Sequence, residues 1–492
     1  MTNKKRTLVF ISVLLAMFIS AVEATIVTTA MPSIAADLGN FSRYSWIFSS
    51  YLLMSTVSVL VYGKLADLYG RKPIFLIGVT IFLIGSFGAG FSTTMEILIV
   101  FRFIQGLGAG AVAPMATTIV GDLYSLEERA KVQGYMSSVW GISAVLGPAI
   151  GGMIVEYASW QMIFWINIPI GLLSMVGVYL YLQEDGVRKK VSIDYRGVFF
   201  SSVFLIALII WLTEGGQSFP YFSIVGWLLL VVASMSFILF IRAQKSSTEP
   251  MLSLDVWKRP TIFYANIVTF VTGMILIAIS SYLPPFVTGV MGEKPIIAGF
   301  ALTAMSIGWP IASTISGHLL LRFGPFLVSF AGGFSLIIGA SILLWLAGHV
   351  TPLLAAIASF FVGVGMGLTS TAFIVSIQQA VPYEQRGEAT ASNMFMRNFG
   401  NTLGAAFFGA LLNRSLQKSV DGTTLTVDDM NILFSEDALS KLPFEVLHQM
   451  QPMLEQALHY VYLGILGLAI LATLLILKIP KGKVVVHDSN RT

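Results

Sequence analysis

About fourteen apolar runs, each long enough to cross a lipid bilayer as a helix, are the feature that most constrains the fold of this chain. A run of roughly 18 or more residues with few charges is the usual sign of a membrane-spanning helix. The composition agrees, because 56% of the 492 residues are hydrophobic and only 11% are charged, against about 25% charged in a typical soluble domain. We therefore expect an all-α integral membrane protein.

The chain lacks the residues that several classes of chemistry require. The chain has no cysteine and only five histidines, which are scattered, so disulfides, thiol catalysis and a metal cluster are not expected. It has no glycine-rich phosphate-binding loop beside a lysine, which argues against direct use of ATP. We expect neither an enzyme nor a metal or cofactor site. No nucleic-acid partner is expected either, in spite of the formal net charge of +4.

The basic residues predict the side of the membrane on which each loop lies. If the amino terminus is cytoplasmic, most lysines and arginines fall in cytoplasmic loops and few in external loops. A missed or invented span would reverse every later loop and spoil this bias. Both termini are therefore predicted to be cytoplasmic, and the apolar run after Arg6 is interpreted as the first span, not a cleaved signal peptide.

A short internal repeat indicates two related halves. Residues 63–70 (GKLADLYG) follow the second predicted span, and residues 317–324 (GHLLLRFG) follow the tenth with the same glycine spacing. Chance could produce one such repeat, but two halves around a central site are a transporter architecture. The predicted division is a six-helix bundle at 1–185, two inserted helices with linkers at 186–260, a second six-helix bundle at 261–480, and a tail at 481–492.

One long polar segment interrupts the second half. Residues 413–457 are acidic and are predicted to form an external loop. A packed cap and a partly ordered loop are both compatible with the sequence.

Glu23 and Arg102 are charges inside predicted spans. Glu23 lies in the first span and Arg102 in the fourth, at a similar predicted depth of roughly 10 Å. An unpaired charged carboxylate is costly in a membrane, so such residues are usually functional. Glu23 is predicted to hold a proton in one conformation and to release it in another. Arg102 either tunes that carboxylate or bonds backbone carbonyls. Arg397 is a third intramembrane charge, with no acidic partner at its depth, and it has a functional or a structural role.

The fifth predicted span carries a face of small residues. Ser143, Gly147 and Gly151 recur every four residues and allow a neighbouring helix to come close. Pro148 removes a backbone donor and favours a bend. These residues leave a hinge and a tight helix contact equally open.

Six segments together resemble a known transporter family. Residues 63–72 and 102–108 resemble the loop 2–3 signature and the fourth-helix motif of the major facilitator superfamily, and residues 134–151 resemble its antiporter motif. Residues 23–32, 160–169 and 249–250 resemble motifs of its fourteen-span drug:proton antiporters. The chain departs from the pattern at Ser143, where glycine is usual, and at Glu23 and Thr28, where Asp and Asn are usual.

The resemblance implies the major facilitator fold, two six-helix bundles plus two inserted helices, and proton-coupled export by alternating access. It implies a plasma-membrane location, a bacterial source, and the proton motive force in place of a cofactor. Arg102 would belong to a proton relay. The implied gating motif is Gly63, Asp67, Gly70, Arg71 and Arg129. The implied antiporter motif is Gly134, Ser143, Gly147, Pro148 and Gly151.

Competition for one carboxylate would couple proton entry to the export of a compound. A proton and a lipophilic cation cannot both neutralise Glu23 at once, so binding of one favours loss of the other. Tyr51 and Trp140 are predicted to face the cavity and to stack on planar cations, with packing or lipid contact as the alternative.

The expected partners are lipophilic cations or neutral drugs, protons and membrane lipids, and the chain is expected to be a monomer. A dedicated exporter of one metabolite, antibiotic or lipid is the main alternative. A proton-coupled importer is less favoured, because of the residues at 134–151.

Overall fold

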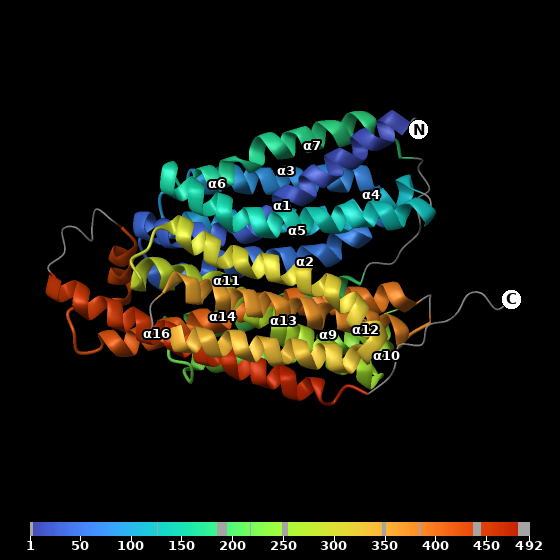
Figure 1. Ribbon diagram of the computed structural model, residues 1–492. Coiled ribbons are helices and arrows are strands. Elements are labelled where there is room, and N and C mark those ends of the chain that lie inside the picture. Colours follow the sequence, from blue (N-terminus) through green and yellow to red (C-terminus); the bar gives the residue numbers. More distant parts are fainter. Residues whose placement is uncertain are drawn as a thin grey trace. The chain divides into compact units, whose positions relative to one another are not determined.

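The computed structural model describes residues 3–124, 126–184, 194–216, 218–247, 254–346, 351–382, 385–435 and 444–480. In these ranges the chain is helical and forms no strand (Figure 1), which confirms the all-α prediction. The predicted tail at 481–492 lies outside the described residues, as do the linker residues 186–193, 217 and 248–253.

The first part of the chain contains α1 (Asn3–Leu38), η1 (Phe41–Arg43), α2 (Tyr44–Tyr69), α3 (Arg71–Gly90), α4 (Met95–Leu123), α5 (Leu126–Tyr157), α6 (Met162–Trp165), α7 (Asn167–Tyr181), α8 (Tyr195–Glu214) and α9 (Ile224–Ser246). The second part contains α10 (Leu254–Trp257), α11 (Pro260–Pro285), η2 (Phe286–Val290), α12 (Pro295–Leu346), α13 (Pro352–Gln379), α14 (Arg386–Val420), η4 (Val427–Phe434) and α16 (Phe444–Ile476).

Among the described residues, twelve helices are long and apolar enough to cross a membrane. One of them, α12, covers 52 residues and contains Gly324 with φ 77° and ψ 166°, a non-helical conformation. A straight helix of that length would measure about 78 Å, far more than the roughly 30 Å of a bilayer core. α14 is not among the twelve, because it carries polar and charged residues such as Arg386 and Arg397.

Each of the two repeats ends in a glycine, and the two glycines have similar backbone conformations. Gly70 separates α2 from α3 with φ 97° and ψ 158°, and Gly324 has nearly the same angles within α12. This region of φ and ψ is accessible essentially to glycine alone. The two repeats therefore match in backbone conformation as well as in glycine spacing.

The chain forms two compact units. Unit 1 consists of Met1–Met251, Ser280–Thr303 and Thr402–Val461, and unit 2 consists of Leu252–Ile279, Ala304–Asn401 and Tyr462–Thr492. Within unit 1, α1 packs on α5 and α7, α4 packs between α2 and α3, and α8 packs on α9. Small residues permit these contacts, because a Cβ on Gly108 would lie 2.2 Å from the backbone nitrogen of Phe82.

Unit 2 uses the same kind of contact between its helices. A Cβ on Gly367 in α13 would lie 2.4 Å from the backbone oxygen of Trp309 in α12. A Cβ on Gly273 in α11 would lie 2.5 Å from the backbone oxygen of Arg397, and one on Gly400 in α14 would lie 2.1 Å from that of Phe270. The backbones of α11 and α14 are therefore in close contact at Arg397 and at Gly400, which follows it by about one turn.

Helices cover most of residues 413–457, the segment for which the sequence predicts an external polar loop. α14 continues to Val420, η4 covers Val427–Phe434, and α16 begins at Phe444. Hydropathy marks where a helix leaves the apolar layer, but not where it ends. The extensions remain helical because they bury one face each, with Leu412, Leu416 and Val420 on α14 and Met450, Leu454 and Ala457 on α16.

The segment between these extensions is a packed cap on unit 1, which decides between the two alternatives for its described part. Phe434 stacks on Phe41 with ring centroids 5.5 Å apart. Asp428 accepts a hydrogen bond from the backbone nitrogen of Ser42 at 3.0 Å. The side chain of Asn413 donates to the backbone oxygen of Ser42 at 2.5 Å.

Candidate functional site

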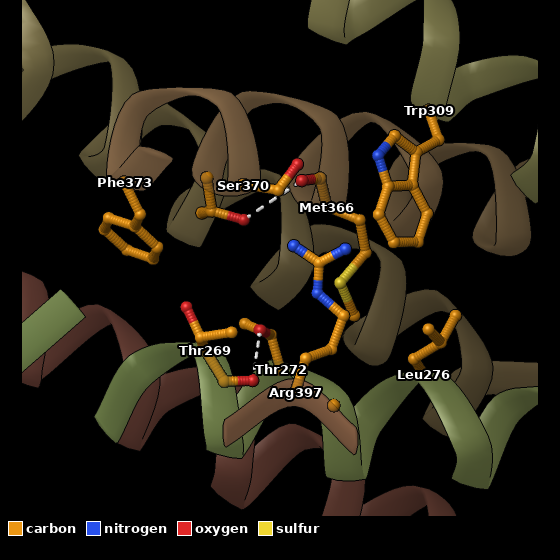
Figure 2. Close-up of a pocket in the computed structure, with 10 residues that line it drawn as sticks. Thr269, Thr272, Leu276, Trp309, Met366, Ser370, Phe373 and Arg397 are labelled. Carbon is orange, nitrogen blue, oxygen red and sulfur yellow. Dashed lines mark hydrogen bonds between the residues drawn. The ribbon is translucent and has the colours of Figure 1, made fainter. Parts of the chain in front are cut away.

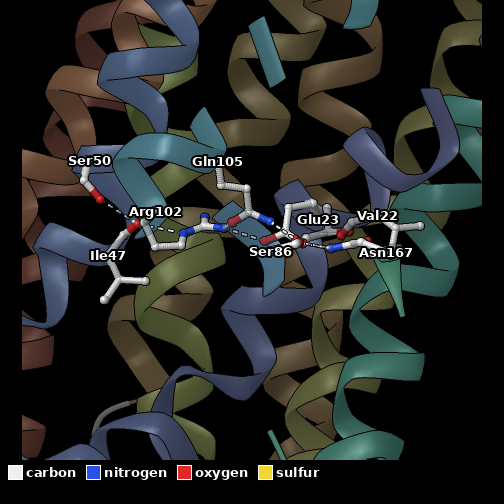
Figure 3. Close-up of polar contacts among 9 residues, drawn as sticks. Val22, Glu23, Ile47, Ser50, Ser86, Arg102, Gln105 and Asn167 are labelled. Atoms are coloured by element: carbon white, nitrogen blue, oxygen red, sulfur yellow. Dashed lines mark hydrogen bonds and ion pairs between the residues drawn. The ribbon is translucent and has the colours of Figure 1, made fainter. Parts of the chain in front are cut away.

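Glu23 is buried inside unit 1 and is hydrogen-bonded at both carboxylate oxygens. It lies on α1 and is 1% exposed. Its Oε1 pairs with Nη1 of Arg102 on α4, and its Oε2 accepts from Nδ2 of Asn167 on α7 at 2.7 Å. Figure 3 shows these side chains in one line of polar contacts. The structure thus brings Glu23 and Arg102 into direct contact.

Arg102 is held by three helices. It is 2% exposed, and its Nη1 also donates to Oε1 of Gln105 at 2.7 Å. Its Nε donates to the backbone oxygen of Ile47 at 3.3 Å. Its guanidinium carbon lies 4.2 Å from the centre of the Tyr51 ring, a cation–π contact. Arg102 therefore contacts both the carboxylate of Glu23 and a backbone carbonyl.

Two neutral amides and a hydroxyl complete the network. Nε2 of Gln105 donates to Oγ of Ser86 at 2.8 Å, and Nδ2 of Asn167 donates to the same oxygen at 2.9 Å. Sequence reasoning did not assign these three residues to the site. Gln105 and Asn167 lie in segments of the family resemblance, which was the one signal available for them.

Close helix contacts fix the positions of these side chains. A Cβ on Gly106 would lie 2.4 Å from the backbone oxygen of Tyr51, so α4 contacts α2 directly beside Arg102. A Cβ on Gly85 would lie 2.4 Å from the backbone nitrogen of Gln105, so α3 contacts α4 one turn away. The polar groups are thus held at hydrogen-bond distance by rigid backbone contacts.

The arrangement suits an ionised carboxylate. Both groups that contact the Glu23 oxygens are donors, and a guanidinium has no acceptor and stays protonated. A proton on Glu23 would replace one of these accepted bonds and would leave Arg102 without its counter-charge. Breaking a buried pair in this way is strongly unfavourable, by about 3–5 kcal/mol. Protonation of Glu23 and displacement of Arg102 are therefore linked events.

The two aromatic candidates lie in different environments. Tyr51 is 5% exposed and covers the guanidinium of Arg102. Trp140 lies on α5 and is 44% exposed, and it takes no part in the polar network of the described residues. The structure brings Tyr51, but not Trp140, to Glu23.

Gly70 and Arg71, two of the predicted gating residues, form the turn between α2 and α3. Arg71 forms an ion pair with Asp122 at the end of α4, and Glu184 accepts hydrogen bonds from the backbone nitrogens of Arg71 and Lys72 at 2.5 and 3.3 Å. Sequence reasoning did not identify Asp122 or Glu184. The side chains of Asp67 and Arg129 lie outside the described residues. Gly63 lies in α2 with no atom within 4 Å of a Cβ position.

The small-residue face of α5 packs on α1. A Cβ on Gly147 would lie 1.9 Å from Oγ1 of Thr25, and one on Gly151 would lie 2.3 Å from Oγ1 of Thr29. Oγ1 of Thr25 also lies 3.5 Å from the backbone oxygen of Ser143. The surroundings of Gly134 lie outside the described residues. This face is therefore a tight helix contact.

Another side of α5 contacts the first part of α12 in the same unit. A Cβ on Gly299 would lie 2.3 Å from the backbone oxygen of Pro148. Thr303 donates to the backbone oxygen of Val145 at 3.3 Å. α5 remains helical through Pro148, so its residues 143–151 are packed between α1 and α12.

The comparisons with known proteins agree with this architecture. Residues 13–405 match the family model described as Major Facilitator Superfamily. The chain is 32% identical over 488 residues to Multidrug resistance protein 3 of Bacillus subtilis, covering 97% of this chain and 95% of the relative. It is 31% identical over 505 residues to Multidrug transporter protein MdtP of the same organism, covering 95% and 92%.

A solved structure matches over nearly the whole chain. It is the inward-facing, unoccupied form of a bacterial homologue of the human lysosomal transporter Spinster, with a TM-score of 0.65 and 17% identity, covering 98% of this chain and 100% of that chain. At this identity the likeness concerns the fold alone.

Proposed function

The chain belongs to the major facilitator superfamily, and on that premise we propose that it is a proton-coupled antiporter that exports lipophilic, often cationic compounds by alternating access. As a member of this family it is a multi-pass membrane transporter and not an enzyme. The observation that carries the proposal is the buried pair of Glu23 and Arg102, closed by Asn167 and Gln105. The names of the two Bacillus relatives support the substrate class.

The proposed topology has fourteen spans and both termini in the cytoplasm. The twelve apolar helices become fourteen spans when α12 is divided at Gly324 and α14 is added. α8 and α9 would be the inserted pair between two six-helix bundles. The hydrogen bond from Trp46 of α2 to Glu214 at the end of α8, 2.7 Å long, supports a fixed position for this pair on unit 1. The plasma membrane is the proposed location.

The proposed coupling begins with the carboxylate of Glu23. A proton that reaches Glu23 removes the counter-charge of Arg102, and the ion pair opens. A cationic compound that displaces Arg102 would compete with the proton for the same carboxylate. One binding event therefore excludes the other, which is the requirement for exchange.

The charge balance sets the driving force for this exchange. Export of one monovalent cation for one proton moves no net charge, so the pH difference alone drives it. Export of a neutral compound for one proton also uses the membrane potential, at about 2.3 kcal/mol per 100 mV. The proposed cytoplasmic gate is the turn at Gly70, with Arg71 paired to Asp122.

Everted membrane vesicles that contain the full chain test the proposal. After a pH gradient has been imposed, addition of ethidium or tetraphenylphosphonium should dissipate it, as followed with a pH-sensitive dye. Glu23→Gln should abolish this response, because glutamine cannot exchange a proton. Glu23→Asp should retain it, since a carboxylate remains.

A matched control is Glu96→Gln, the same change at an exposed glutamate on α4, which should respond like the unchanged protein. Proton-linked export that survives in Glu23→Gln would refute the assigned role of Glu23. A response to one metabolite alone, among a broad panel, would identify a dedicated exporter instead.

A further inference from the structure

An open hollow of about 700 Å³ runs along one face of α9. The residues that line it recur every three or four positions, among them Trp227, Val231, Met235, Ile238 and Arg242. This spacing places them on one side of the helix. Pockets that hold small ligands usually measure about 300–1,000 Å³, so the hollow has room for a chain-like molecule.

The hollow lies on the outer side of the α8–α9 pair. Val231 and Met235 are 57% and 61% exposed, whereas Ala233, Ser236 and Phe240 on the opposite side of α9 are buried. The buried side packs on α8. Within unit 1, the hollow therefore faces the surroundings of the protein, which for a membrane-spanning helix are lipid chains.

Arg242 lines one end of the hollow. Nε2 of Gln244, two residues later, donates to Oδ2 of Asp194 at 2.7 Å, so the end of α9 lies beside the start of α8. The exposed side chains of Arg196 and Lys245 are at this same end of the helix pair. The hollow thus changes from an apolar lining to a basic end.

The basic character of this end does not depend on the pairing of single residues. Residues 186–196 and 242–250 contain six basic and two acidic residues. Positive charge therefore remains in excess whichever pairs these residues form with one another. Basic clusters directly beside a membrane-spanning helix attract anionic lipids.

A phospholipid fits both parts of the hollow. A guanidinium binds a phosphate through paired donors, which suits Arg242 to the headgroup. Val231 precedes Arg242 by eleven positions, about 16 Å along a helix. This is about half of the roughly 30 Å hydrocarbon core, the depth that an acyl chain of one leaflet reaches. Between these two residues, Ser234 is small and Met235 is adaptable.

Charge favours a lipid over a second copy of the chain as the occupant. A two-fold axis along the membrane normal would place the same face of α9 from two copies together. Arg242 of one copy would then lie close to Arg242 of the other, which is unfavourable. An anionic lipid brings the opposite charge to the same place.

We propose that this face of α9 binds one anionic phospholipid, with its phosphate on Arg242 and an acyl chain in the hollow between Arg242 and Val231. The inference requires a membrane-spanning α9 and does not depend on proton coupling. It assigns the α8–α9 pair a role in lipid recognition, apart from the site at Glu23.

Native mass spectrometry of the full-length protein tests this site. Micelles that contain equal amounts of dipalmitoyl-phosphatidylglycerol and dipalmitoyl-phosphatidylcholine should yield protein that retains one phosphatidylglycerol in preference. Arg242→Gln should weaken this binding by roughly tenfold. Arg259→Gln is the matched control, because Arg259 is also exposed but does not line the hollow. Equal retention of the two lipids, or equal losses in the two variants, would overturn the proposal.

A second pair of variants tests the hollow without a change of charge. Ile238→Trp fills it and should also weaken phosphatidylglycerol binding. Ile206→Trp, the same change at an exposed isoleucine of α8, should not. In the unchanged protein, dihexanoyl-phosphatidylglycerol should bind less tightly than the dipalmitoyl form, because its chains leave most of the hollow empty. Equal affinities of the two chain lengths would show that the hollow takes no part.

The same spectra report whether a second copy covers this face. A dimer that Ile238→Trp dissociates, with no phosphatidylglycerol retained by the unchanged protein, would assign the face to self-association and overturn the lipid site. A monomer that keeps one phosphatidylglycerol, and loses it in both Arg242→Gln and Ile238→Trp, is the expected result.

Discussion

Units 1 and 2 each contain a glycine turn of the same conformation, but the arginines Arg102 and Arg397 have different surroundings in the two units. Gly70 and Gly324 end the same sequence pattern in nearly the same backbone conformation. Arg102 of unit 1 is paired with a carboxylate from a neighbouring helix. Arg397 of unit 2 points toward Met366 and Trp309 (Figure 2), with its guanidinium carbon 5.7 Å from the centre of the Trp309 ring, and forms no ion pair among the described residues.

The difference teaches what each charge can respond to. The pair in unit 1 is neutral as a whole, and in the proposed cycle it separates when a proton joins Glu23. Arg397 has no ion-pair partner among the described residues of unit 2, so this kind of separation is not available to it.

The largest expected effect on stability comes from a substitution that breaks the Glu23–Arg102 pair in unit 1. Arg102→Gln leaves Glu23 buried without its counter-charge and should lower the free energy of unfolding by about 3–5 kcal/mol. The double change Glu23→Gln with Arg102→Gln should recover most of that loss, because no charge is then left unpaired. Unfolding in detergent mixed with increasing fractions of sodium dodecyl sulfate measures both.

Arg397→Gln is the matched change in unit 2 and should not lower stability, since it removes a charge that no described residue of unit 2 neutralises. If Arg397→Gln lowers the free energy of unfolding as much as Arg102→Gln does, then Arg397 has a partner of similar strength. The contrast between the two arginines would then not hold.

A smaller effect on stability is expected at the glycine turn that each unit contains. Gly70→Ala and Gly324→Ala should each cost about 1–3 kcal/mol, because the conformation of both glycines is strained for any residue with a Cβ. Gly63→Ala and Gly317→Ala are the controls, since a Cβ at either position meets no atom within 4 Å. The controls should be neutral or slightly stabilising in the same unfolding measurement. Equal effects at all four positions would argue against a shared turn.

The smallest effect sharpens the description of Arg397. Trp309→Leu should lose about 0.5–1 kcal/mol of interaction with the guanidinium. A double-mutant cycle with Arg397→Gln separates this coupling from the loss of packing. A coupling energy of zero would mean that Trp309 packs beside Arg397 without stabilising its charge.

The buried charges of both units could be found from the sequence because they interrupt apolar runs. Glu23, Arg102 and Arg397 are conspicuous for that reason, and the similar depth of Glu23 and Arg102 made their interaction one of two alternatives. Asn167, Gln105 and Ser86 are neutral, and nothing in their local sequence separates a hydrogen-bonding amide from an ordinary one. Their role depends on which helices become neighbours.

The ends of the helices were harder to predict than their existence. Asp122 and Glu184 lie in polar segments where acidic residues are common, so their contacts with the start of α3 gave no signal. The extensions of α14 and α16 were missed because hydropathy averages hide a narrow apolar face such as that of Leu412, Leu416 and Val420. The glycine pattern at 317–324 was informative, since it specifies a backbone conformation and not merely a polarity.

The cap on unit 1 also orders events during synthesis. Ser42 has its backbone nitrogen bound to Asp428 and its backbone oxygen bound to Asn413, residues that follow it by 386 and 371 positions. At about 5–20 residues per second, a ribosome needs on the order of tens of seconds to supply them. Until then Ser42 lacks both hydrogen bonds. The connection between α1 and α2 is therefore completed only after most of the chain has been made.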